Sequence, residues 1–96
     1  MNDYNNIKLN DYISLAKVNI ENEFVETYLY DTDDMYKAVR IKDKASGKQV
    51  GRFLPMDKET PLTFNYKAYQ QLPESEKDRL EELNQKFIHY TQIEPI

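Results

Sequence analysis

The side chains that could support catalysis are few, and none of them forms a recognisable catalytic pattern. His89 is the only histidine and cysteine is absent, which excludes disulfides, thiolate nucleophiles and cysteine-based metal sites. None of the three serines lies in a G-x-S-x-G motif. Gly47 and Gly51 are the only glycines, so neither a P-loop nor a dinucleotide fingerprint can be written. The sequence therefore predicts a protein that is not an enzyme and that binds no cofactor. His89 is expected near the end of a helix, where the helix dipole favours the imidazolium.

An acidic segment, Asp-Thr-Asp-Asp at residues 31–34, offers three carboxylates to a hard cation such as Ca²⁺. It lacks the glycine at the sixth position of an EF-hand loop. It also lacks the glutamate at the twelfth position, where Lys42 stands instead. A solvated turn, whose aspartates accept local backbone hydrogen bonds, is favoured. We therefore predict no metal site.

Most of the positive charge lies in residues 35–55, which have the pattern of a β-hairpin. Residues 37–58 hold seven basic side chains and two acidic ones, a local charge of +5, and the rest of the chain carries −9. Two runs rich in β-branched and aromatic residues, 36–42 and 49–54, flank a polar connection that contains Ser46 and Gly47. Such a bipolar molecule favours oriented docking on a charged partner.

The apolar pattern of this hairpin predicts its register. With residues 44–47 as the loop, the expected cross-strand pairs are Asp43 with Lys48, Ile41 with Val50, Val39 with Arg52 and Ala38 with Phe53. The apolar side chains that then share one face are Val39, Ile41, Val50 and Leu54. A bulge at Gly51 would shift this register.

The other face of the hairpin is expected to combine aromatic rings with cations. The candidate residues for binding a partner or a nucleic acid are Tyr36, Arg40, Lys42, Lys44, Lys48, Arg52 and Phe53. Single-stranded nucleic-acid binders use this combination of stacking rings and positive charge. The ordinary interpretation is that the cations protect a strand edge, and that Tyr36 and Phe53 pack beneath the C-terminal helix.

A second candidate surface is acidic and lies on the predicted C-terminal helix. Its residues are Glu74, Asp78, Glu81 and Glu82. Such a row could imitate the phosphates of a nucleic acid and so inhibit a nucleic-acid-binding enzyme. The alternative is a solvated helix face, which is what a row of charges on a helix usually is.

Eight tyrosines in 96 residues exceed what a core of this size needs, because each buried hydroxyl requires a hydrogen-bond partner. Some tyrosines are therefore expected on the surface. Tyrosine is enriched at protein interfaces, so contact with another protein is a reasonable interpretation. Solvated tyrosine tips over a half-buried sheet are the equally weighted alternative.

Length and composition predict one soluble domain spanning residues 1–96. The chain is 40% hydrophobic and 31% charged, which is typical of a globular protein and not of a disordered or fibrous one. No run approaches the roughly 18 apolar residues of a membrane span, and the N-terminus does not resemble a signal peptide. We expect a cytoplasmic protein that does not bind membranes.

The elements are predicted by periodicity and by turn residues. Residues 1–6 are expected to be frayed, 7–55 rich in β-structure, 56–63 a loop and 64–92 helical. Residues 7–20 fit a helix or a strand, and the regular spacing of the turns favours a strand. A short helix near 64–72 is followed, after Pro73, by a helix over 74–90 with an apolar stripe of Leu80, Leu83, Phe87 and Tyr90.

The predicted fold is α+β: a small antiparallel β-meander of three or four strands, covered on one face by two C-terminal helices. The predicted function is a small non-enzymatic interaction or regulatory protein that binds a protein partner as an inhibitor or accessory factor. The alternative is a nucleic-acid-binding module that uses the basic hairpin. A small enzyme with a carboxylate site is the least favoured interpretation. The oligomeric state is open, because edge strands can pair across a two-fold axis.

Overall fold

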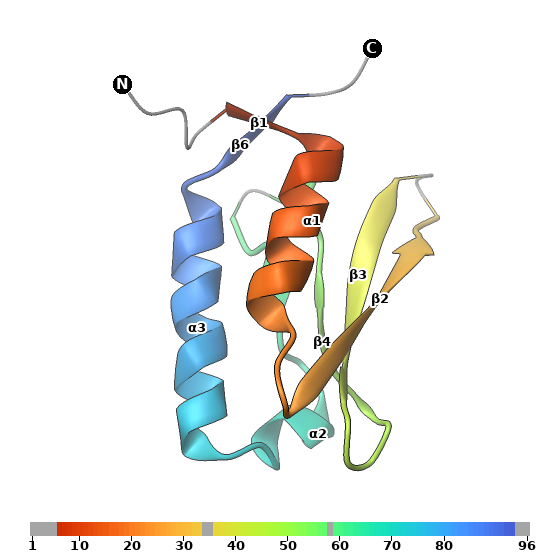
Figure 1. Cartoon of the computed structure of the whole chain (residues 1–96), viewed down its shortest axis with the longest axis vertical. Coiled ribbons are helices and arrows are strands. Elements are labelled where there is room, and N and C mark those ends of the chain that lie inside the picture. The colour runs from red at the N-terminus through yellow and green to blue at the C-terminus, as the bar shows by residue number, and fades with distance from the viewer. Residues whose placement is uncertain (1–5, 34–35, 58, 94–96) are drawn as a thin grey trace.

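A four-stranded antiparallel sheet forms one layer of the protein (Figure 1). In this computed structural model, residues 6–33, 36–57 and 59–93 are described. The strands follow the chain in the order β2 (Val25–Asp31), β3 (Lys37–Asp43), β4 (Gln49–Phe53) and β5 (Leu62–Thr63). Each strand therefore pairs with the next one, as in the expected meander, and the predicted α+β class is confirmed.

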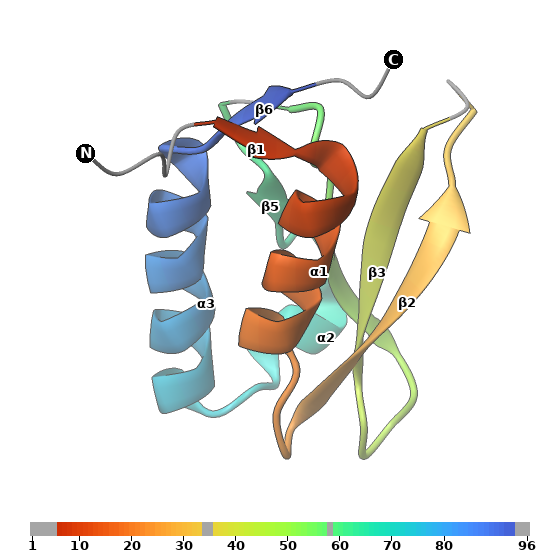
Figure 2. The same cartoon turned by 45° about the horizontal axis from the view of Figure 1, so that its top comes forward.

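Helices cover one face of this sheet (Figures 1 and 2). They are α1 (Leu9–Ile20), the four-residue α2 (Lys67–Gln70) and α3 (Glu74–Ile88). A parallel pair of short strands, β1 (Asn6–Lys8) and β6 (Thr91–Ile93), joins the two ends of the described chain. The helical layer thus contains the expected C-terminal helices and, in addition, an N-terminal one.

The strand preference for residues 7–20 is wrong, because α1 occupies most of that segment. Alternation would have placed Ser14, Ala16 and Val18 on one side. Instead, Ala16 is fully buried, whereas Ser14 is exposed and Val18 is 76% exposed. The buried face of α1 consists of Tyr12, Ile13, Ala16 and Ile20, which recur at helical spacing. Packing against both the sheet and α3 selects this period.

The core lies between the sheet and the pair α1 and α3. Tyr12 contributes a ring that contacts Phe53 edge-on, with centroids 5.0 Å apart, and a hydroxyl that donates a 2.9 Å hydrogen bond to the carbonyl of Phe87. Phe87 in turn meets Phe53, with centroids 5.3 Å apart. This aromatic cluster connects α1, α3 and β4, and burial of the Tyr12 hydroxyl raises the pKa of Tyr12.

The predicted register of the β3–β4 hairpin is correct beside the turn and wrong beyond a bulge. The amide N–H of Asp43 donates to the carbonyl of Lys48, as expected. A register shift between Ile41 and Lys42 then pairs Ile41 with Gly51 and Val39 with Phe53. The expected pairs of Ile41 with Val50, Val39 with Arg52 and Ala38 with Phe53 are therefore not formed.

The bulge has a clear cause in the apolar pattern of β4. Because one extra residue is inserted, Val50 and Phe53 can both enter the core, where each is fully buried. Leu54, expected on the core face, lines a hollow on the other side of the sheet. Phe53, expected beside Arg40, lies in the core.

The C-terminal helix α3 follows its sequence signals closely. It begins at Glu74, directly after Pro73, and buries Leu80, Leu83 and Phe87 as its apolar stripe. Tyr90, the expected last member, lies beyond the end of the helix and is partly buried against the core. His89 is the C-cap residue and is exposed.

Candidate binding face

The sheet face opposite the helices carries the best candidate site, and we call it the outer face. Five large side chains of this face come from three strands: Tyr28 and Tyr30 of β2, Arg40 and Lys42 of β3, and Arg52 of β4. Cross-strand pairing brings them together, since Tyr28 is opposite Arg40 and Arg40 is opposite Arg52. None of the described helices covers this face (Figure 2).

Two cations of the outer face lie over two tyrosine rings. The guanidinium carbon of Arg40 is 4.6 Å from the ring centroid of Tyr30. The Nζ atom of Lys42 is 5.1 Å from the ring centroid of Tyr28. Both distances are within the range of a cation–π contact, which holds long side chains in place without using up their hydrogen-bond donors. The contact with Tyr30 thereby holds the guanidinium group of Arg40 in place before any ligand binds.

Arg40 and Arg52 form an unusual pair, because two like charges stand directly opposite each other on neighbouring strands. Such pairs are destabilising unless an anion lies between them. Among the described residues neither arginine makes a salt bridge with an acid. The sheet therefore presents two arginines at directly opposed positions that have no carboxylate partner in the described part of the chain.

The two arginines line a hollow of about 390 Å³. Its other lining residues are Tyr30, Asp31, Thr32, Asp33, Tyr36 and Leu54. The hollow is thus cationic on its β3–β4 side and acidic toward the β2–β3 connection. A ligand group that is anionic and compact would fit the cationic side.

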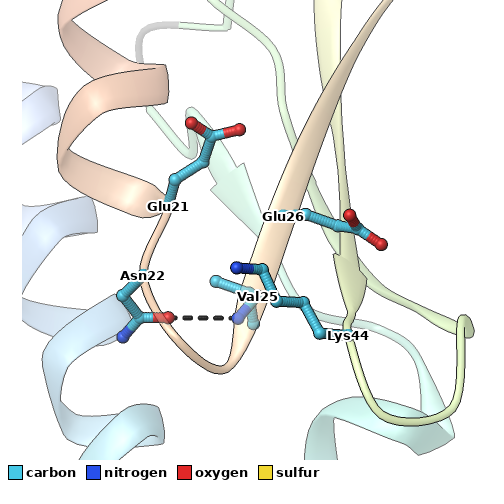
Figure 3. Close-up of a pocket in the computed structure, with 5 residues that line it drawn as sticks. All are labelled: Glu21, Asn22, Val25, Glu26 and Lys44. Atoms are coloured by element: carbon cyan, nitrogen blue, oxygen red, sulfur yellow. Dashed lines mark hydrogen bonds between the residues drawn. The ribbon is translucent and has the colours of Figure 1, made fainter.

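The structure separates the remaining predicted binding residues from this face. Lys48 lies at the turn of the hairpin and lines another hollow, beside Lys67 of α2. Lys44 lines a third hollow with Glu21 and Glu26 (Figure 3). Phe53 is fully buried. The predicted set therefore divides: Tyr36, Arg40 and Arg52 share one hollow, Lys42 lies on the same sheet face, and the other three lie elsewhere.

The residues that line the hollow in Figure 3 stabilise a turn of the backbone. The Asn22 Oδ1 atom accepts hydrogen bonds from the backbone N–H groups of Phe24 and Val25, at 2.8 and 3.0 Å. Glu21 accepts a 2.6 Å hydrogen bond from the Thr27 hydroxyl. This bond is the main reason why the pKa of Glu21 lies below its usual value. The polar groups of Glu21 and Asn22 serve to fix the connection from α1 to β2.

The four acidic candidates are exposed on α3. Helical spacing places them on the side of α3 opposite its buried stripe. Two of them already have partners: Glu74 makes a 3.5 Å ion pair with Lys77, and Glu81 accepts a 3.1 Å hydrogen bond from the Tyr69 hydroxyl. These contacts favour the solvated-face interpretation of the row.

The sequence reasoning missed Tyr28 and Tyr30, the rings that accompany the cations. Their signal is the alternation of tyrosines along β2. A five-residue connection, 32–36, then brings β2 back against β3, so that Tyr30 is opposite Ala38 and Tyr28 is opposite Arg40. Pairing the strand at 24–30 with the one at 36–42 would have identified both.

Other classes of site find no support in the described residues. No group of three His, Cys, Asp or Glu side chains there could hold a metal ion. No helix in the same ranges has the length and apolar character needed to cross a membrane. Comparisons with protein-family models, with curated proteins and with solved structures find no match.

Proposed function

We propose that this is a non-enzymatic protein that binds a protein partner through the outer face, with Arg40 and Arg52 gripping a carboxylate of that partner. The observation that carries the proposal is the opposed arginine pair without an acidic partner among the described residues. A carboxylate between two guanidinium groups accepts several charge-assisted hydrogen bonds and removes their mutual repulsion.

The tyrosines of the outer face supply the apolar part of such an interface. Tyr28 is 44% exposed, and Tyr30 and Tyr36 are partly exposed. Tyrosine and arginine are among the residue types enriched in the residues that dominate interface energies. Because Arg40 and Tyr30 are already in contact, little side-chain entropy is lost on binding.

The distribution of acids favours a protein over a nucleic acid. Asp31 and Asp33 line the same hollow as the arginines, and Glu26 is directly opposite Lys42. A nucleic-acid strand needs a positive groove along several phosphates. A single carboxylate, in contrast, needs only the two arginines, which occupy directly opposed positions.

The proposal is tested by affinity capture from host lysate with three proteins. We expect the wild type and a Lys44→Ala/Lys48→Ala variant to retain the same partner, whereas Arg40→Ala/Arg52→Ala loses it. Both variants remove two positive charges from the same hairpin, so a non-specific charge effect would affect them equally. Equal capture by all three proteins, each verified as folded by circular dichroism, would contradict the proposal.

We propose nucleic-acid binding as a second candidate, because two cation–π contacts on one sheet face resemble a stacking platform. A gel-shift titration with a single-stranded oligonucleotide tests it. If it is correct, log affinity falls linearly with log salt, and Arg40→Ala or Arg52→Ala weakens the complex. Absence of a complex at low salt removes this candidate.

A further inference from the structure

Strand β2 lies at an edge of the sheet, and its backbone has one paired side and one side that points away from β3. The carbonyl of Phe24 accepts from the N–H of Lys44, and the N–H of Thr32 donates to the carbonyl of Tyr36, both at 2.9 Å. Backbone groups alternate in an antiparallel ladder. The even-numbered residues of β2 therefore bond to β3, and the odd-numbered ones direct their N–H and C=O groups outward.

The connection between α1 and β2 covers the first half of this outward edge. Asn22 bonds to both backbone groups of Val25: its N–H donates to the carbonyl, and its Oδ1 accepts from the N–H. At Thr27, the N–H donates to Glu21 at 3.3 Å, and the carbonyl accepts from the Lys17 ammonium at 3.4 Å. The outward backbone groups of Val25 and Thr27 are thus already hydrogen-bonded, either to side chains or to the turn.

The second half of the edge is open. The outward groups belong to Leu29 and Asp31, and no described group outside the sheet bonds to their backbone. Figures 1 and 2 both show β2 diverging from α1 toward this end. The Leu29 side chain is 52% exposed. An exposed edge with an exposed apolar side chain is a template for another strand.

We infer that the open half of β2, residues 28–31, binds an extended, basic segment of a partner protein as an additional strand. Leu29 and Asp31 would supply two N–H donors and two C=O acceptors, and Leu29 would contact an apolar side chain of the segment. The outward backbone groups of this edge are distinct from the arginine side chains, although Tyr30 and Asp31 also line the arginine hollow, and the inference does not depend on the proposed function.

Charge decides between a partner segment and a second copy of this chain. Acids outnumber cations around the edge: Glu21, Glu23 and Glu26 lie near the beginning of β2 and Asp31 and Asp33 near its end, whereas Lys17 bonds to Thr27 and Lys37 pairs with Asp31 at 2.7 Å. If two copies of β2 paired antiparallel, the acids near the end of each strand would face the acids near the beginning of the other strand. The two-fold symmetry would repeat this repulsion at both ends. Lysine or arginine in the added strand instead meets opposite charge.

The test uses a blocked peptide of alternating lysine and valine, with a glutamate–valine peptide as the charge-reversed control. Hydrogen exchange of the protein amides is followed by NMR. In the free protein, the N–H groups of Leu29 and Asp31 should exchange fast and those of Tyr28 and Tyr30 slowly. At a lysine–valine concentration about ten times its Kd, exchange at Leu29 and Asp31 should slow about tenfold. The glutamate–valine peptide should have no such effect.

A pair of substitutions at one position isolates the backbone contribution. Leu29→Pro removes an outward N–H that the β3 ladder does not use, and an edge strand tolerates proline at such a position. It should abolish peptide binding, whereas Leu29→Ala keeps the N–H and binds. If Leu29→Pro fails to fold, Leu29→Lys replaces it, because its charge repels the basic peptide.

Three results would overturn the inference. One is exchange protection at residues outside β2 only. Another is equal binding of the two peptides. The third is a concentration-dependent dimer, seen by sedimentation without peptide and lost in Leu29→Lys, which would assign the edge to a second copy.

Discussion

At the scale of single residues, Glu76 is a carboxylate held in the interior by two partners, Asn22 and Arg79. It is 5% exposed. Both of its oxygens accept from the Asn22 side-chain amide at 3.0 Å and from the guanidinium of Arg79. Arg79 also donates to the carbonyls of Asn19 and Ile20, at 2.8 Å each, which are the last two residues of α1. One ion pair therefore connects α3, the end of α1 and the turn that follows it.

Removing Arg79 should destabilise the protein strongly, because Glu76 would remain buried without its counter-ion. Loss of one member of a buried ion pair typically costs about 3–5 kcal/mol. We expect Arg79→Ala to lower the free energy of unfolding by roughly 3 kcal/mol in urea denaturation, since the arginine side chain itself is 28% exposed. Lys86→Ala, an exposed cation on the same helix, is the control and should change stability by less than about 0.5 kcal/mol. Equal effects of the two substitutions would contradict this role.

Glu21 should titrate below its usual value, because the Thr27 hydroxyl donates to its carboxylate. A lowered pKa in the folded state contributes stability above the unfolded value, and this contribution is lost as pH falls through the folded pKa. Thr27→Val removes the hydroxyl, so the pKa of Glu21 should rise, as measured by carboxyl NMR. The pKa of Asp57, which the Thr60 backbone N–H lowers, should not change. An unchanged Glu21 pKa would show that another group is responsible.

At the scale of elements, Gly51 permits the close approach of β5 to β4. A Cβ atom at this position would lie 2.5 Å from the backbone carbonyl oxygen of Thr63 and 2.8 Å from the ring of Phe64. Gly51→Ala should therefore displace β5 and lower the free energy of unfolding by about 1–3 kcal/mol. Gly47, at φ +74° in the turn, has open space within 4 Å of the point that a Cβ atom would occupy. Gly47→Asn is the control, because asparagine tolerates this backbone region at little cost. Chemical denaturation of both variants measures the difference.

Local signals were sufficient for some elements and insufficient for others. The helix α3 could be predicted because Pro73, the acids after it and the stripe at Leu80, Leu83 and Phe87 all indicate the same element. The apolar residues of the α1 segment fit both the helical and the strand period, so contacts with α3 and the sheet decide which element forms. The hairpin register could be predicted only beside Gly47. Farther from the turn, burial of Val50 and Phe53 introduces a bulge that turn chemistry does not encode.

The candidate site was predictable only in part for the same reason. Arg40 and Arg52 are evident as cations of a hairpin, but their direct opposition results from the bulge: in the bulge-free register Arg52 would have paired with Val39. The rings of Tyr28 and Tyr30 come from a different strand, β2. The sequence indicates the turn that follows β2 but does not indicate the register in which β2 pairs with β3. Contacts between elements, and not residue types, were the missing information.

At the scale of the whole molecule, the two charged candidate surfaces occupy opposite sides. The arginine pair lies on the outer face of the sheet, and the acidic row of α3 points away from the core on the helical side. The protein measures 38 × 31 × 21 Å, and a helix with its side chains is about 10 Å thick. The two surfaces are therefore separated by more than the Debye length of about 8 Å at physiological salt. A partner on one surface experiences little of the other.

This separation allows the two candidate surfaces to be distinguished by one variant. Replacing Glu74, Asp78, Glu81 and Glu82 with serine changes the formal net charge from −4 to 0. If the outer face binds the partner, affinity at 0.15 M salt should change by less than about threefold, because the removed charges are screened. At low salt the association rate should change more, since long-range steering is then active. Titration calorimetry and stopped-flow kinetics at two salt concentrations measure both quantities. A loss of binding at 0.15 M salt, with Arg40→Ala/Arg52→Ala still binding, would instead identify the acidic row as the interface and support the phosphate-mimic hypothesis.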